Sequence, residues 1–257
     1  MQTPTSLSAQ ELEQFKRDGY LIFRGMASAE LCAQMAAVTR DHLQRAVPPL
    51  EHEAEVGYPG APGSLDAPGG RTARRLRNAY QRHASFRAWA EDERIVTRME
   101  QLFGEPVCLT LAHHNCVMTK HPRYGTATGW HRDIRYWRFL RPDLVTVWLA
   151  LGEESDANGA LRVIPGSHRL DIQPSQLDEL DFLRPDVAQN QALFAQGIAL
   201  ELHPGDVLFF HSGLFHSAGT NTGNEVKTSV VFAYRGQSNS PLAGSRSAAA
   251  GDVPLSK

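Results

Sequence analysis

The feature of this sequence that most restricts its fold is a change of hydrophobic period near residue 104. Beyond that point, five runs are rich in alternating, β-branched and aromatic residues, and turn-forming residues separate them. The runs are VCLTLAHHNCVMTK, LVTVWLALG, GALRVIPGS, IALELHPGDVLFFH and VKTSVVFAYRG. Such a succession favours antiparallel sheets in a sandwich or barrel, so we predict a β core over about residues 105–236.

The residues before this core predict helices. Ser8 followed by Glu11 is a capping box that opens a first helix. Ser28 can cap a second helix, and the run SFRAWAEDERIVTRMEQLF predicts a third, which ends at Gly104. We therefore predict a mainly β fold in which helices of the segment 8–104 flank the core.

Two segments are predicted to be irregular. Residues 47–75 begin with many Pro and Gly residues and end in a basic stretch, so they predict a long loop, either a lid or an exposed basic surface. Residues 237–257 are small and polar and predict a mobile tail. With 42% hydrophobic residues, the chain is large enough to bury one core, and we predict one domain over residues 1–257.

Charge and cysteine content argue against several classes of protein. The formal net charge is −2 without a long run of one sign, so nucleic acid is not an expected partner. Three cysteines without a CxxC spacing are typical of free thiols in a reducing compartment. Neither a leader pattern nor a long apolar run is present, so we expect a cytoplasmic protein without a transmembrane segment.

A candidate metal site lies in the run TGWHRDIRYW, where one residue separates His131 from Asp133. Side chains at i and i+2 of an extended segment point to one face, so both can bind one ion while Arg132 points away. The pair alone is weak evidence, and a third ligand has to come from another strand. Two histidines and one carboxylate form the facial triad of non-haem iron(II) oxygenases. The downstream candidates are His168, His203, His211 and His216.

The chain resembles the phytanoyl-CoA dioxygenase family of iron(II)- and 2-oxoglutarate-dependent oxygenases. The resemblance is carried in order by YLIFRG, GWHRDIRYW, VWLAL, NGALRVIPGSH, PGDVLFFHSGLFHSAGTN and KTS, over about residues 8–235. It implies a double-stranded β-helix, or cupin-like jelly roll, with Fe(II) as cofactor and 2-oxoglutarate as co-substrate. It also implies that His131 and Asp133 are two of the metal ligands.

The family's spacing favours His216 over His211 as the third ligand. In this family a basic residue at a fixed distance after the distal histidine binds the far carboxylate of 2-oxoglutarate. Eleven residues after His216 comes Lys227, whereas eleven residues after His211 comes Thr222. Relatives usually carry arginine at this position, and lysine offers a point charge instead of a bidentate fork. Ser229, on the same strand face, can supply a second hydrogen bond.

The resemblance and the strand pattern indicate further residues at the pocket. Relatives often have a serine where this chain has Ala218, and Ser217 is an imperfect substitute. Lys120 is expected at the surface. The residues expected near the co-substrate are Thr128, Trp148 and Asn115. The residues expected on the substrate side are Tyr136, Trp137 and Arg75, although Trp148, Tyr136 and Trp137 are equally suited to packing in the core.

The expected reaction is hydroxylation of an unactivated C–H bond of a small organic molecule by molecular oxygen, with release of succinate and CO2. Asp133 argues against halogenation, because halogenating relatives carry a small residue in place of the acid. An anionic substrate is indicated by the arginines Arg71, Arg74, Arg75 and Arg77. The alternatives are a zinc-dependent or other cupin-like hydrolase or isomerase, and a non-catalytic binding module. The sequence predicts no particular oligomeric state.

Overall fold

A computed structural model describes residues 5–255 of the protein, and the first four residues of the predicted domain lie outside this range. The helices are α1 (Ala9–Asp18), α2 (Ala29–Gln44), α3 (Ala79–Arg82), α4 (Ala84–Ala90), α5 (Glu93–Phe103), α6 (Ala188–Phe194) and α7 (Arg246–Ala250). The strands are β1 (Tyr20–Phe23), β2 (Leu50–His52), β3 (Ala73–Arg77), β4 (Val107–Lys120), β5 (Thr128–His131), β6 (Leu144–Ala150), β7 (Leu161–Val163), β8 (Ile198–Ala199), β9 (Val207–His211), β10 (His216–Ala218), β11 (Lys227–Gly236) and β12 (Asp252–Pro254). The predicted change from helices to strands near residue 104 is confirmed.

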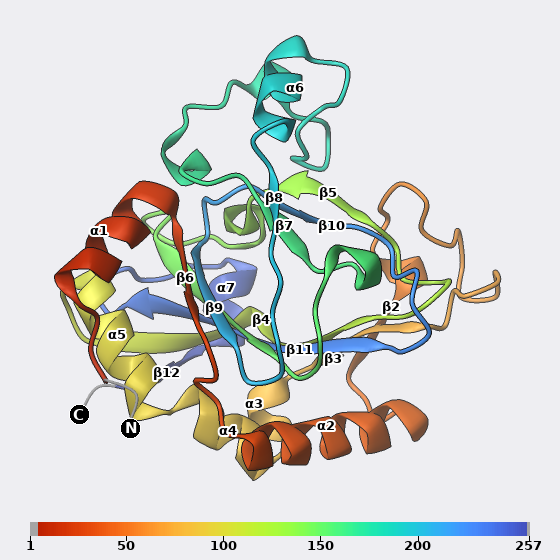
Figure 1. The fold of residues 1–257 in the computed structure, drawn as a ribbon, viewed down its shortest axis with the longest axis horizontal. Helices are drawn as coiled ribbons and strands as arrows, with labels where there is room; N and C mark the ends of the chain where they lie inside the picture. Colours follow the sequence, from red (N-terminus) through yellow and green to blue (C-terminus); the bar gives the residue numbers. More distant parts are fainter. Residues whose placement is uncertain (1–4, 256–257) are drawn as a thin grey trace.

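The strands form two antiparallel sheets that face each other (Figure 1). The larger sheet has the order β1-β9-β6-β11-β4-β3-β2, and β12 also pairs with β4. The smaller sheet has the order β5-β10-β7-β8. Between the sheets lies an apolar cluster to which both contribute, including Trp148 and Phe210 from the larger sheet and Val163 from the smaller. Burying such alternating faces against each other is the main apolar stabilisation of a two-sheet fold.

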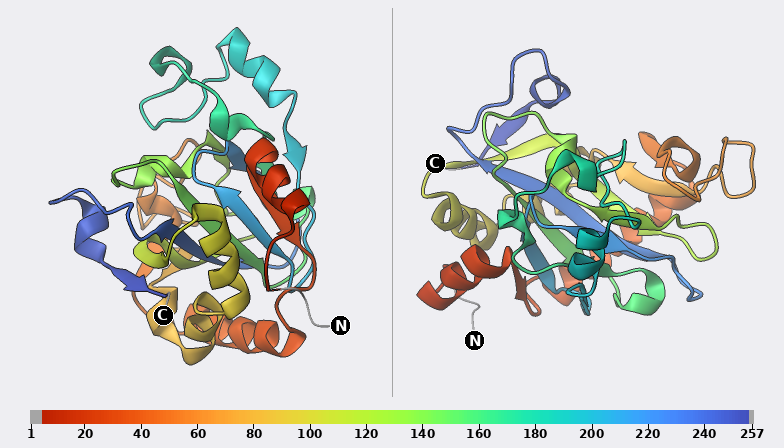
Figure 2. Two further views of the ribbon diagram at one scale, coloured as in Figure 1. Left: turned by 90° about the vertical axis from the view of Figure 1, so that its left-hand side faces the viewer. Right: turned by 90° about the horizontal axis from the view of Figure 1, so that it is seen from above.

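The outer face of the larger sheet is covered by helices. Phe15 of α1, Met35 of α2, Trp89 of α4 and Met99 of α5 pack in one cluster with side chains of that sheet, such as Val147. Figure 1 and Figure 2 show α2, α4 and α5 along this side, while α6 stands at the opposite end of the molecule. The prediction of a mainly β fold with flanking helices is confirmed.

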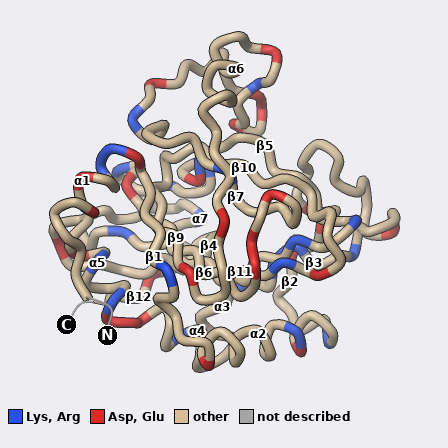
Figure 3. The backbone as a smooth tube through the Cα atoms, in the orientation of Figure 1, with Lys and Arg blue, Asp and Glu red and all other residues tan. Residues whose placement is uncertain are grey.

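Residues 47–75 are more ordered than predicted. β2 pairs with β3, which in turn pairs with β4 and extends the larger sheet. Arg74 and Arg75 on β3 are only 3% and 6% exposed, so the basic stretch seen at β3 in Figure 3 is not an exposed surface. The interpretation of this stretch as a solvated basic face was therefore wrong for Arg74 and Arg75, whereas Arg71 and Arg77 are exposed. Movement of the preceding loop as a lid stays a prediction.

The prediction of a mobile tail was wrong for the part of the tail that the structure describes. Val253 in β12 pairs with Leu109 in β4, because the edge of β4 beyond its pairing with β3 offers free backbone groups. The side chain of Ser247 in α7 accepts a hydrogen bond from the backbone N–H of Arg138 at 3.0 Å. Residues 256–257 lie outside the described range.

A bulge in β4 shapes the interior. The β11 residue Phe232 pairs with Asn115, but its neighbour Ala233 pairs with Thr110, so residues 111–114 have no partner in that ladder. His113 within the bulge has a φ of 60°, a conformation that costs free energy for a residue with a side chain. Bulges redirect side chains locally, and this one turns His114 towards the space between the sheets.

Within residues 5–255, no helix combines the length and apolar character that a membrane crossing requires.

Candidate active site

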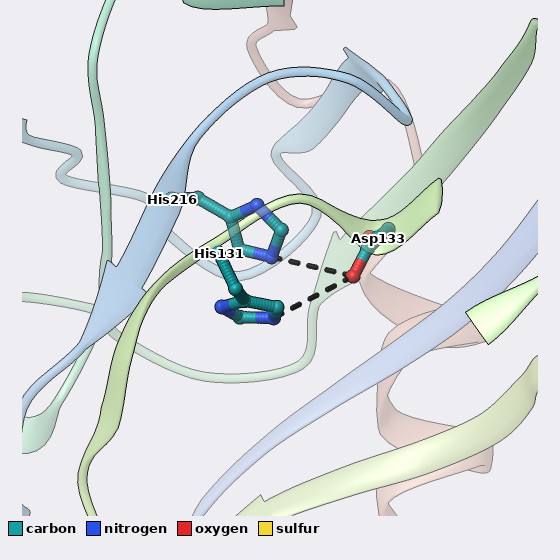
Figure 4. A group of neighbouring side chains, drawn as sticks. All are labelled: His131, Asp133 and His216. Carbon is teal, nitrogen blue, oxygen red and sulfur yellow. Dashed lines mark ion pairs between the residues drawn. The ribbon is translucent and has the colours of Figure 1, made fainter. Parts of the chain in front are cut away.

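Two histidines from neighbouring strands meet a carboxylate inside the smaller sheet. His131 ends β5 and pairs directly with His216, which begins β10. Asp133 begins a short 3-10 helix, so the HxD segment is not the continuous strand expected from the sequence. The Asp133 Oδ1 atom lies 3.7 Å from Nε2 of His131 and 3.5 Å from Nε2 of His216 (Figure 4). Arg132 points away, as expected, and lies over the ring of Phe215.

The hydrogen bonds around these three side chains prepare them to bind a metal ion. Nδ1 of His131 donates to the Gly129 carbonyl at 2.9 Å, and Nδ1 of His216 donates to the Leu214 carbonyl at 3.0 Å. In the neutral form of each ring, Nε2 then carries the lone pair and faces the carboxylate. Ligand atoms about 2.1 Å from one ion at right angles would lie about 3 Å apart. The observed separations need only a small contraction, so the residues fit a divalent metal ion.

Electrostatics favour the ligand forms of Asp133 and His131. Burial alone would raise the pKa of the Asp133 carboxyl, but the adjacent His114, His216 and His131 hold that pKa below its ordinary value. Burial, reinforced by His216, lowers the pKa of His131 well below its ordinary value. Asp133 is therefore an anion and His131 is neutral near pH 7, which are the ligand forms of both residues. Burial alone would lower the pKa of His216, but the adjacent Asp133 carboxylate raises it, so a metal ion competes with a proton at this residue.

The other candidate histidines lie elsewhere. His211 accepts a hydrogen bond from the Gly213 backbone N–H at 2.9 Å and contacts Asp143, and its ring lies 5.2 Å from that of His168. His203 pairs with an exposed glutamate at the surface. Among the described residues, the one group of three side chains placed to hold a metal ion is His131, Asp133 and His216.

A cavity adjoins the three side chains. Of the residues predicted at the pocket, those that line it are Thr128, Tyr136, Arg75, Trp148, Lys227, Ser217 and Ala218. Tyr136 shares a hydrogen bond with the hydroxyl of Tyr58 at 2.6 Å, and Thr128 accepts one from Arg74 at 2.9 Å. Tyr58 belongs to the loop before β3, which therefore closes one side of the cavity.

The residues assigned to the far carboxylate of 2-oxoglutarate already hold a carboxylate of the protein. Glu154 accepts hydrogen bonds from Ser229 Oγ at 2.5 Å, from Trp148 Nε1 at 3.0 Å and from Lys227 Nζ at 3.2 Å. Its own backbone is fixed by two hydrogen bonds with Leu202. Lys227 is therefore buried and paired in this structure.

Two predicted pocket residues serve the scaffold instead. Trp137 is 2% exposed, packs with Phe139 and Leu144, and donates its Nε1 hydrogen to the Ala112 carbonyl at 2.9 Å. It turns inward because the chain curls into the 3-10 helix rather than staying extended. Asn115 accepts a hydrogen bond from the backbone N–H of Tyr80 at 2.8 Å and so anchors α3. Neither side chain lines the cavity next to His131.

Replacing Trp137 with Phe is expected to lower the free energy of unfolding by about 1–3 kcal/mol, because the indole hydrogen bond is lost and a small void is left. Urea unfolding followed by tyrosine and tryptophan fluorescence measures the change. Replacing Tyr136 with Phe is the matched control, which leaves the same core intact. A Trp137→Phe protein as stable as the parent would contradict the packing role.

Three of the four arginines that suggested an anionic substrate are paired with carboxylates of the protein. Arg71 pairs with Asp66 at the surface, Arg74 pairs with buried Glu53 at 3.0 Å, and Arg75 pairs with Glu51 at 2.8 Å. These charges are already compensated, so they do not support an anionic substrate.

Several residues at the cavity were missed or misplaced from the sequence. Lys120 is buried, not at the surface, and strand alternation from Cys116 through Met118 already places it on the inner face. No sequence signal marks Glu154 or Tyr58, since each follows a turn and reaches the cavity only through the tertiary fold. His114 depends on the bulge, which alternation does not predict.

Comparison with known proteins identifies the family. The family model described as phytanoyl-CoA dioxygenase matches residues 15–229. A probable phytanoyl-CoA dioxygenase of Caenorhabditis elegans is 29% identical over 134 residues, which are 49% of this chain and 43% of that protein. An ectoine dioxygenase of Bordetella parapertussis is 23% identical over 254 residues, which are 91% of this chain and 77% of that protein.

Solved structures agree with the fold. EctD from S. alaskensis superimposes with a TM-score of 0.75 at 21% identity, covering 92% of this chain and 79% of that one. The α-ketoglutarate-dependent epimerase SnoN from nogalamycin biosynthesis has a TM-score of 0.69 at 25% identity, covering 88% and 82%. The predicted jelly-roll fold is confirmed. Because the family model matches most of its length, the chain belongs to the phytanoyl-CoA dioxygenase family of iron(II)- and 2-oxoglutarate-dependent oxygenases.

Proposed function

We propose that this protein hydroxylates a C–H bond of a small anionic molecule, using Fe(II), 2-oxoglutarate and molecular oxygen and releasing succinate and CO2. The observation that carries the proposal is the buried group of His131, Asp133 and His216, which opens onto a cavity. Iron bound there would supply the oxidising chemistry together with 2-oxoglutarate. We also propose a cytoplasmic location, which the three free cysteines support.

The residues of this chain hold, orient and shield the reactants. His131, Asp133 and His216 would hold the ion, and their arrangement next to the cavity would leave room for the reactants there. Thr146 and His114 each lie 3.4 Å from the Asp133 Oδ2 atom and keep the carboxylate in place. The hydrogen-bonded Tyr58 and Tyr136 close the cavity beside the metal site and limit the access of water.

Arg135 lines a second pocket, which shares Tyr136 with the cavity beside the metal group, and it supports an anionic substrate that reaches into both. Its guanidinium lies 4.4 Å from the ring of Phe182 and 5.0 Å from that of Tyr136, and it also faces Tyr58. One of its nitrogens is buried without a hydrogen-bond acceptor among the described residues. A buried N–H donor of a cation without an acceptor is costly, and a carboxylate or phosphate group of the substrate would satisfy it.

The test is a turnover screen that pairs each candidate acid with its neutral amide or methyl ester. For the acids only, we expect succinate release together with a product that is heavier by one oxygen atom, about 16 mass units. Replacing Arg135 with Gln should reduce turnover of the acid by about 10- to 100-fold while leaving 2-oxoglutarate binding intact. Equal turnover of acids and their esters would contradict the anionic preference.

A further inference from the structure

The second pocket, which shares Tyr136 with the cavity beside the metal group, is rich in positive charge. It lies where the end of β3, the bulge of β4 and helix α7 come together. Among residues 5–255, four arginines and no aspartate or glutamate line it, namely Arg77, Arg135, Arg138 and Arg246. The whole chain has a net charge of −2, so this charge is a local concentration.

The four arginines are not compensated by carboxylates of the protein. Within the described residues none of them forms an ion pair, whereas Arg74 and Arg75, which precede Arg77 in β3, each do. One nitrogen of Arg135 is also buried without a hydrogen-bond acceptor among these residues. Uncompensated guanidinium groups in a concave site attract an anion from solution.

The C-terminal tail forms one wall of this pocket and is fixed at both ends. The Ser247 side chain in α7 accepts a hydrogen bond from the Arg138 backbone N–H at 3.0 Å. The strand that follows α7, β12, pairs with β4. The Arg138 guanidinium in turn donates to the Trp137 carbonyl at 3.1 Å. Arg246 of α7 is therefore carried by an ordered wall.

An uncharged donor adds to the arginines. The Asn115 amide donates a hydrogen bond to Oε1 of Gln81 at 3.2 Å. The Gln81 side chain thus uses its acceptor within the protein, and its NH2 group makes no hydrogen bond among the described residues. The second pocket therefore offers a ligand both charged and neutral N–H donors.

The number of unpaired arginines favours a phosphate group over a carboxylate. A carboxylate carries one charge and is satisfied by a single bidentate arginine, which Arg135 alone could supply. A phosphate monoester carries about two negative charges near pH 7 and has three strong acceptor oxygens. Arginine suits such a group because its planar fork binds phosphate oxygens in pairs.

We propose that the substrate carries a phosphate group, which the second pocket binds while the C–H bond to be hydroxylated lies in the cavity beside the metal group. This inference rests on the proposed function and names an organic phosphate as its substrate class. The ring of Tyr136, which lines both pockets, has its centroid 6.1 Å from that of the ligand His131. The two pockets therefore meet within one side chain of the metal group.

The first experiment measures binding of phenyl phosphate by calorimetry, using iron-loaded protein with 2-oxoglutarate and without oxygen. Arg246→Gln should weaken binding by about tenfold and the double variant Arg77→Gln, Arg246→Gln by about 100-fold, since each change removes a charged hydrogen bond. Benzoate should bind the parent about tenfold more weakly than phenyl phosphate. Replacing Arg40, which is exposed on α2, with Gln is the matched control and should change nothing.

Two readouts exclude other causes of these effects. Arg77 and Arg246 are both exposed and unpaired within residues 5–255, so the variants should melt at the temperature of the parent. Phenyl phosphate should leave the visible absorbance of the iron and 2-oxoglutarate complex of the parent unchanged. Loss of that absorbance would place the phosphate on iron and overturn the inference.

The second experiment separates a phosphate group of the substrate from free phosphate. Organic phosphates are screened for turnover beside the alcohols that remain after phosphate removal. We expect turnover of a phosphate at least about tenfold above that of its alcohol, and loss of this advantage in the double variant. Inorganic phosphate added to the alcohol should not restore turnover. Restoration would identify free phosphate as a separate effector and overturn the inference.

The outcomes distinguish this inference from the proposed function. Parent protein that does not bind phenyl phosphate, or arginine variants that bind it as tightly as the parent, overturns the inference and leaves hydroxylation of another anion standing. Parent protein that neither binds nor consumes 2-oxoglutarate overturns the proposed function, and with it the assignment of the phosphate to a substrate. Calorimetry reports phosphate binding in either case.

Discussion

Replacing His216 with Ala is expected to reduce 2-oxoglutarate-dependent turnover to background and to abolish stoichiometric iron binding. The reason is geometric. His216 faces His131 across the β5–β10 pair and directs Nε2 at the Asp133 carboxylate, so its loss leaves two ligands that cannot hold one face of the ion. Iron content after desalting and succinate release measure the two effects.

The matched control is His211→Ala, which changes the other histidine of the same sequence run. His211 lies on β9, where its ring contacts Asp143 and the backbone of Gly213, and it does not belong to the metal group. The His211→Ala protein should keep iron and turnover. If it loses iron while His216→Ala retains iron, the ligand assignment is wrong.

Replacing Glu53 with Gln is expected to lower the free energy of unfolding by about 3 kcal/mol or more. Glu53 is fully buried, receives Arg74 at 3.0 Å and accepts a hydrogen bond from the Thr126 backbone N–H at 3.2 Å. Without the carboxylate, the Arg74 guanidinium stays in the interior with Lys120 as its neighbour and no compensating charge.

Two companion variants make this stability prediction specific. Replacing Arg74 with Met in the Glu53→Gln protein should recover most of the loss, since no unpaired charge then remains. Replacing Asp66 with Asn breaks the exposed pair with Arg71 and should leave stability unchanged. Denaturant unfolding measures all three proteins, and a Glu53→Gln protein as stable as the parent would contradict the account.

The sequence predicts structural features that depend on local patterns, and it fails for features that depend on contacts between distant residues. Runs rich in β-branched and aromatic residues between turn-forming residues predict β4, β6, β9 and β11, although both faces of these strands are largely buried. The mobile tail was predicted wrongly because β12 is held by the free edge of β4, which no local pattern reveals. Exposure of Arg74 and Arg75 in β3 was predicted wrongly because their partner carboxylates lie more than 20 residues away in the sequence.

The candidate site divides in the same way. The HxD spacing and the step from His216 to Lys227 identify three side chains that the structure brings together and a fourth that lines their cavity. Trp137 was misplaced because the segment after Asp133 curls into a 3-10 helix. Glu154 accepts hydrogen bonds from Lys227, Ser229 and Trp148. No sequence signal predicts this, because only the packed fold brings the four side chains together.

The most direct test of the central claim is an anaerobic titration of the iron-loaded protein with 2-oxoglutarate. If His131, Asp133 and His216 hold iron with open positions towards the cavity, a weak visible charge-transfer band should grow to one equivalent of 2-oxoglutarate. Zinc-loaded protein should show no band, since zinc has a filled d shell. Absence of the band in iron-loaded protein, together with substrate turnover by the zinc form without oxygen, would contradict the account and favour a cupin-like hydrolase or isomerase.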